Sequence, residues 1–262
     1  MFYWKLARYK WVYVTIGFFF LALSFKEPVI HYLTFNPNAP DLANFDGLKI
    51  KNEILQSMLS VENRLFDFNM KNVEFLVLLI VLMGYDYASL KDKFIRLGIG
   101  KNTTYHKMRK FLKIQLGLLA SSIYLFMFWL LIIGLMIATG TSLEDRHLHG
   151  FLDGSLLDHF FSGKLSYLIF FSLWMALGVF INCLLYFKVL DITKNFLRGA
   201  GFYFICLIPG CMLLYYILPS WFVPLTSLLS ITYFDWTIPK LLSPFIPYLI
   251  GYGVLSYYDR DI

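Results

Sequence analysis

The feature that most constrains the fold is the length of the uncharged apolar stretches. The clearest of them runs from Ile114 to Ser142 without a charged residue. As a helix, a run of about 20 apolar residues crosses a hydrocarbon core of about 30 Å. Charged residues make up only 15% of the chain, against about 25% in soluble domains. The sequence therefore predicts an all-α polytopic membrane protein whose single membrane domain fills residues 1–262.

Six apolar stretches are long enough for spans. We expect transmembrane helices at about 11–34, 73–90, 112–138, 165–187, 199–218 and 241–258. Pro209-Gly210 predicts a bend in the fifth of them. A cleaved signal peptide is the alternative for the first, because Ala22-Leu23-Ser24 resembles a cleavage site.

The segment 86–113 is basic and sets the expected orientation. It carries eight Lys and Arg residues against Asp86 and Asp92. Basic loops stay on the cytoplasmic side of a membrane, and this choice places 15 of the 23 Lys and Arg residues inside. Both termini are then cytoplasmic, and 36–72, 140–164 and 219–240 are outer segments. Because the net charge of +6 is explained by topology, it does not indicate a nucleic-acid partner.

Two outer segments carry further patterns. In the first, Ile54, Met58, Val61 and Leu65 recur at helical spacing, which predicts an amphipathic helix over about 46–66. The segment 219–240 is apolar but broken by prolines. A pair of short re-entrant helices covered by protein fits it better than a straight span.

Motifs for chemistry are weak. The predicted spans three to six carry no ionisable residue in their central parts, which argues against a proton relay. Gly98-Ile99-Gly100-Lys101-Asn102 lacks the first Gly and the Ser or Thr of a phosphate-binding loop. His147, His149 and His159 lie near carboxylates in 140–164, but their spacing matches no zinc pattern, and a solvated loop is the simpler interpretation. We therefore expect no metal site, no catalytic residue and no cofactor in this chain.

The order of these features resembles the membrane subunits of type-2 ATP-binding-cassette exporters. Asp86 stands where that family often has Glu at the end of the second span, and Ser89-Leu90-Lys91 follows. Leu97-Gly98-Ile99-Gly100-Lys101 occupies the place of the family's Leu-Pro-x-Ser-Arg turn, although Gly98 replaces the usual Pro. Lys107 to Lys113 is similar to the family's basic entry into the third span. The 219–240 stretch is similar to its re-entrant outer gate.

The resemblance implies a permease whose 86–113 segment rests on a separate cytoplasmic ATPase, which would hold ATP and Mg. The residues assigned to coupling are Asp86, Lys91, Lys93, Phe94, Ile95, Arg96, Leu97 and Lys101. Those assigned to the outer gate are Pro219, Trp221, Pro224, Trp236 and Pro239. A second copy or a sibling chain would complete the pathway, and export is the implied direction. The 27 Phe and 18 Tyr favour an amphipathic or hydrophobic substrate such as a peptide, lipid or drug.

Two other interpretations stay open at this point. The basic segment could serve topology alone. The chain could also be a non-transport immunity or sensor protein that binds an amphipathic peptide or lipid through 46–66 and 140–164. An intramembrane enzyme is disfavoured because no polar groups converge within the predicted spans. Richness in Lys, Asn and Phe suggests a bacterial plasma membrane.

Overall fold

The computed structural model describes residues 10–38, 46–98, 105–139, 164–228 and 237–258. Within these ranges the regular structure is entirely helical, with no strand. The predicted all-α class is therefore confirmed for the described part of the chain.

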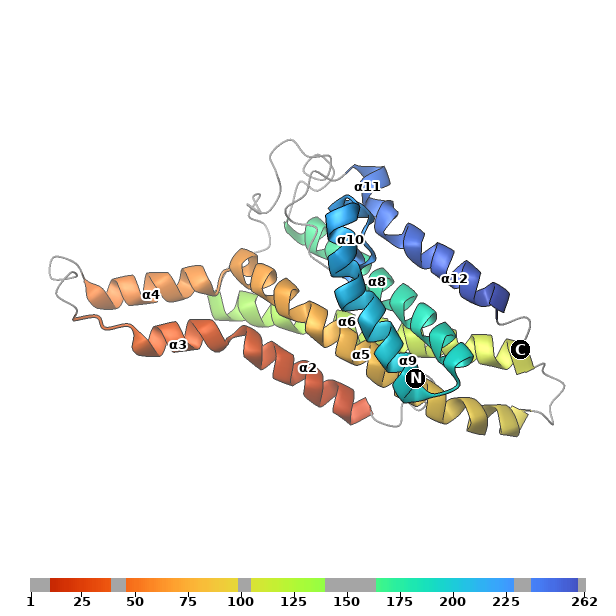
Figure 1. Cartoon of the computed structure of the whole chain (residues 1–262). Helices are drawn as coiled ribbons and strands as arrows, with labels where there is room; N and C mark the ends of the chain where they lie inside the picture. Colours follow the sequence, from red (N-terminus) through yellow and green to blue (C-terminus); the bar gives the residue numbers. More distant parts are fainter. Residues whose placement is uncertain (1–9, 39–45, 99–104, 140–163, 229–236, 259–262) are drawn as a thin grey trace.

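Three long helices form the centre of the bundle (Figure 1). They are α5 (Val61–Gly98), α6 (Tyr105–Thr139) and α8 (Lys164–Thr193), which pack against one another. Their facing sides are apolar at helical spacing, as in Leu76, Ile80 and Met83 of α5, each fully buried. Gly84 of α5 lets the Tyr186 ring of α8 approach closely, because a Cβ at this position would lie 2.0 Å from the ring.

Five of the described helical stretches are long and apolar enough to cross a membrane. They are Trp11–Thr34, Val73–Lys91, Lys107–Thr139, Leu165–Thr193 and Phe196–Ile217. The structure is thus compatible with a multi-pass membrane protein, and these stretches correspond to the first five predicted spans.

The sixth predicted span, 241–258, is broken in the structure. It consists of the end of α11 (Ile238–Leu242), the 3-10 turn η5 (Ser243–Phe245) and α12 (Ile246–Tyr258). Pro244 lies in the turn and Pro247 in the first turn of α12. With 13 residues, α12 is about 20 Å long, shorter than a hydrocarbon core. The sixth span therefore stays a prediction.

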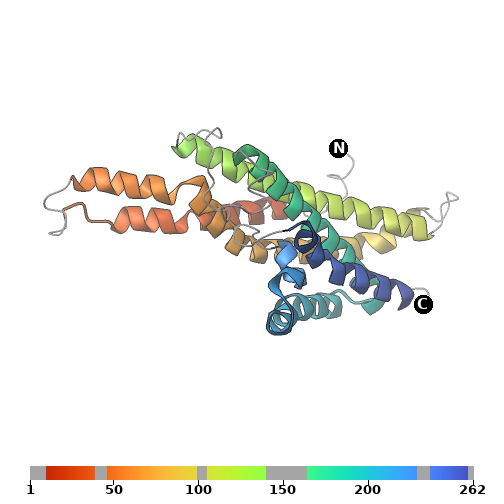
Figure 2. The ribbon, with the colours of Figure 1, turned by 90° about the horizontal axis from the view of Figure 1, so that it is seen from above.

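At the N-terminal side, the predicted first span is two helices. α2 (Lys10–Ser24) packs on α5 and α6, and α3 (Lys26–Thr34) follows after a break at Phe25. α3 pairs with α4 (Gly47–Met58) in a hairpin that extends beyond the central helices in both views (Figures 1 and 2).

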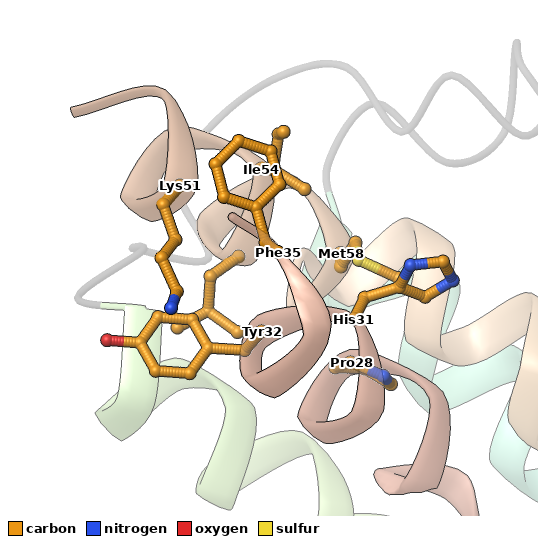
Figure 3. A pocket seen from close by; sticks show the side chains of 8 residues that line it. Pro28, His31, Tyr32, Phe35, Lys51, Ile54 and Met58 are labelled. Carbon is orange, nitrogen blue, oxygen red and sulfur yellow. The ribbon is translucent and has the colours of Figure 1, made fainter. Parts of the chain in front are cut away.

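Side chains of α3 and α4 meet along the seam of this hairpin (Figure 3). Pro28, His31 and Tyr32 of α3 face Lys51 and Met58 of α4 around a small pocket. The Lys51 ammonium lies 4.3 Å from the centroid of the Tyr32 ring, within reach of a cation–π contact.

The prediction of one helix over 46–66 is wrong. α4 ends at Met58 and α5 begins at Val61, because the chain closes a tight turn in which Ser60 N–H donates to the Ser57 carbonyl at 3.2 Å. The Ser60 carbonyl then accepts from Arg64 N–H at 3.0 Å, which opens α5. The apolar periodicity continues across this break.

The fifth predicted span is a helix with a local defect. α9 (Phe196–Ile205) passes through the π-helical turn η2 (Cys206–Gly210) into α10 (Cys211–Ile217). Pro209 lies in that turn and has no N–H to donate, which accounts for the altered hydrogen bonding. Much of α9–α10 is exposed in the single chain; Tyr216, for example, is 90% exposed.

The described part of the 219–240 segment folds back onto the bundle. It forms the 3-10 turns η3 (Ser220–Phe222) and η4 (Pro224–Leu228), and residues 225–228 are buried, with η4 packed on α8. Short broken elements were predicted here. Their depth in a membrane stays a prediction.

Candidate functional site: a charge cluster at one end of the bundle

A buried carboxylate joins the three central helices. The Asp191 side chain of α8 is 0% exposed. Its Oδ1 lies 2.9 Å from Lys91 Nζ and accepts a hydrogen bond from the Tyr87 hydroxyl at 2.7 Å, both from α5. Its Oδ2 pairs with Lys113 Nζ and lies 3.6 Å from Arg109 Nε, both from α6. One carboxylate therefore holds three cations from two neighbouring helices.

Helical spacing explains how each helix delivers its groups. Tyr87 and Lys91 are four residues apart on α5, and Arg109 and Lys113 are four apart on α6, so each pair shares a face. The Tyr87 ring also stacks on Phe187, one turn before Asp191, with centroids 4.8 Å apart. The cluster is thus fixed by packing as well as by charge.

A second buried carboxylate, Asp86, precedes Tyr87 in the sequence and connects α2 to α5. Asp86 is fully buried and accepts a hydrogen bond at Oδ2 from the hydroxyl of Tyr13. The same hydroxyl lies 3.3 Å from the Leu82 carbonyl. Through these contacts α2 is tied to α5 about one turn from the Asp191 cluster.

The cluster lies at the ends of three candidate spans. Lys91 ends one stretch, Arg109 is near the start of the next, and Asp191 is near the end of a third. Beyond it, α5 continues to Gly98 and α6 begins at Tyr105. The described parts of the 86–113 segment are therefore the ends of two long helices, on which Lys107 and Lys110 are exposed.

Such a cluster is hard to disrupt. Removing one partner of a buried ion pair typically costs about 3–5 kcal/mol, because the other charge is left uncompensated. The contacts join α5, α6 and α8, so the cluster fixes the ends of these three helices relative to one another.

The predicted coupling residues divide between this cluster and the remainder of the segment. Asp86 and Lys91 are buried or partly buried, and their contacts are within the chain. The other predicted side chains lie outside the described residues; they are Lys93, Phe94, Ile95, Arg96, Leu97 and Lys101. The structure thus places Lys91, which the sequence assigns to ATPase docking, against Asp191.

The described outer-gate residues lie on the short elements that follow α10. Pro219 precedes η3, Trp221 lies in η3 and Pro224 opens η4. The Trp221 carbonyl accepts from the Ser243 hydroxyl at 2.6 Å, and the Pro224 carbonyl accepts from Tyr248 at 3.0 Å. Pro239 lies in α11, whereas Trp236 is outside the described residues.

Sequence reasoning missed Asp191 as a site residue. The fourth predicted span ends at 187, and Asp191 has no role among the sequence-based predictions. A usable signal was present, because Asp191 is the one acidic residue in the sequence between Asp158 and Asp235. An isolated carboxylate at a basic membrane boundary is a candidate for a buried ion pair. The three histidines considered for zinc lie outside the described residues.

Comparison with known proteins adds no family. No protein-family model, curated protein or solved structure matches the chain.

Proposed function

We propose that the chain is the transmembrane permease subunit of an ATP-driven exporter in a bacterial plasma membrane. The observation that carries the proposal is the Asp191 cluster at the basic end of the bundle. A push on the protruding ends of α5 and α6 would reach α8 through this cluster, since the three helices are bonded there. A separate cytoplasmic ATPase, holding ATP and Mg, would supply that push.

The exposed cations Lys107 and Lys110 are better candidates for the docking contact than Lys91. They lie in the first two turns of α6 and are exposed, whereas Arg109, which lies between them in the sequence, faces the buried cluster. Exposed ion pairs contribute about 1 kcal/mol or less each. Apolar anchors nearby would therefore carry more of the docking energy.

The test is a pull-down of the tagged chain from its native membrane in mild detergent, with identification of co-purifying proteins and an ATPase assay. Lys107→Glu with Lys110→Glu should reduce the recovered ATPase. The matched control is Lys26→Glu with Lys49→Glu, two exposed lysines of the α3–α4 hairpin, far from the basic end in both views (Figures 1 and 2). A chain that purifies alone, or variants that recover as much ATPase as the wild type, would refute the docking role.

The α3–α4 hairpin favours a second candidate function, a binding, immunity or sensor protein for an amphipathic peptide or lipid. The hairpin extends beyond the bundle, and its helix α4, which lies outside the five membrane-length stretches, exposes Leu48 at 64% and Ile54 at 39%. Exposed apolar patches mark interaction sites. Function without any ATPase partner would favour this candidate over the exporter.

A further inference from the structure

A second polar cluster lies near the middle of α8 and contains no charged residue. Asn182 is 0% exposed. Its amide nitrogen donates to the Gly178 carbonyl at 2.8 Å and lies 3.5 Å from the Ser227 hydroxyl. Its amide oxygen accepts from the Tyr203 hydroxyl of α9 at 3.0 Å. The cluster thus joins α8, α9 and the turn η4.

The same cluster extends to α12. The Ser227 hydroxyl donates to the Pro224 carbonyl at 2.8 Å and lies 3.4 Å from the Tyr248 hydroxyl. Tyr248 in turn donates to the Pro224 carbonyl at 3.0 Å. Asn182 of α8 and Tyr248 of α12 therefore contact η4 directly, and Tyr203 of α9 acts through Asn182. On the other side of this five-residue 3-10 element, the Tyr215 hydroxyl of α10 lies 3.0 Å from the Thr226 hydroxyl.

The backbone of η4 is seated directly on α8. A Cβ added at Gly178 would lie 2.4 Å from the Ser227 carbonyl oxygen, too close for any side chain. The absence of a side chain at this position lets the turn approach. The contact is therefore steric as well as polar, and each part can be perturbed separately.

A native thiol lies against this turn. Cys211 of α10 is 2% exposed, and its thiol donates to the Cys206 carbonyl of η2, which packs on η4. One turn further along α10, the Tyr215 hydroxyl contacts η4 directly. Cys183, by contrast, is buried at 0% where α8 faces Gly117 of α6. Movement of η4 should uncover the first thiol and leave the second buried.

We propose that the cluster of Asn182, Tyr203, Ser227 and Tyr248 is a releasable latch that holds residues 220–228 closed on α8. Its bonds are neutral, and a neutral hydrogen bond contributes modestly to stability, so opening leaves no buried charge. This contrasts with the Asp191 cluster, where separation would strand charges. A role for release in opening the outer end of the pathway rests on the proposed exporter function. The hold of the cluster on residues 220–228 does not depend on that function.

The test measures alkylation of single-cysteine variants by N-ethylmaleimide in detergent micelles, without any ATPase. Replacing two of the three cysteines by Ala leaves either Cys211 or Cys183 as the reporter. In the Cys211 reporter, Tyr203→Phe should speed alkylation by about fivefold for its one lost hydrogen bond. Tyr248→Phe should speed it by at least as much, because its hydroxyl makes two contacts with η4. Gly178→Ala should speed it by displacing the turn sterically. The matched control is Tyr216→Phe, at a residue 90% exposed.

Faster alkylation of Cys211 with unchanged Cys183 would establish the latch. Unchanged Cys211 in all three variants would overturn it. Equal acceleration of Cys183 would also overturn it, because the whole bundle rather than the turn would then depend on these bonds. Since no ATPase enters the assay, failure of the latch is distinguishable from failure of the exporter proposal, which the pull-down tests.

Discussion

A buried arginine at the break between α2 and α3 gives the sharpest prediction. In a continuous helix the Ser24 carbonyl would accept from the N–H of residue 28, but Pro28 has none. Arg64 of α5 supplies the missing donor: it is 3% exposed, and its Nη1 lies 2.8 Å from the Ser24 oxygen. The break and the arginine are thus chemically linked although they are 40 residues apart in sequence.

The structure sets the size of the effect. Arg64→Met keeps much of the side-chain length but leaves the buried Ser24 carbonyl without this partner. A hydrogen bond to a charged group contributes about 1.5–3 kcal/mol. For a chain of this size that corresponds to a loss of roughly 3–12 °C in Tm. In a Pro28→Ala background, the restored N–H can donate to Ser24, so the same substitution should cost clearly less.

The assay is a double-mutant cycle on thermal unfolding of the purified protein in detergent micelles. The four proteins are the wild type, Arg64→Met, Pro28→Ala and the double variant. Other contacts of Arg64 are present in both backgrounds and cancel in the cycle. Arg198→Met, at an exposed residue of α9, is the control and should change Tm little. If the destabilisation of the double variant equals the sum of the two single destabilisations within about 0.5 kcal/mol, the two sites are independent and the reasoning is refuted.

Two further predictions follow from buried contacts. Asp191→Asn should destabilise the bundle by about 3–5 kcal/mol, because three cations lose their carboxylate, and folded yield by size-exclusion chromatography should fall sharply. Gly84→Ala should lower Tm because the new methyl would lie 2.0 Å from a Tyr186 ring atom, whereas Gly201→Ala meets nothing within 4 Å and should keep or raise it. An unchanged Tm in Gly84→Ala would mean that the ring moves aside freely.

Much of the helical layout could be predicted because apolar length alone determines it. The predicted second span, 73–90, agrees with Val73–Lys91 to one residue. The fourth was predicted to end at 187, but α8 continues to Thr193. The prediction stopped at the first charge, Lys188, and could not anticipate that Asp191 is neutralised by cations from other helices, which keeps the final turns buried.

The breaks were harder to predict than the spans. Prolines indicated irregular backbone at 219–240, and its described part contains 3-10 turns. The stretch 241–258 was predicted as a span, and the 3-10 turn at Pro244 that breaks it was not anticipated. The break after Met58 has no proline or glycine, and the apolar spacing runs through it. Periodicity reports which face is apolar, not whether the helix is continuous. Likewise, Asn182 finds partners on two other elements, α9 and η4, and these are set by tertiary packing.

The basic segment shows why charge patterns are ambiguous in a membrane protein. Counting Lys and Arg along the chain treats each cation as equivalent, and this is sufficient for topology. In the structure the cations have two different environments. Lys91, Arg109 and Lys113 converge on one carboxylate, whereas Lys107 and Lys110 are exposed. Charge reversal at the first set would test folding and reversal at the second would test partner binding, so a docking experiment is interpretable only when it is confined to the exposed pair.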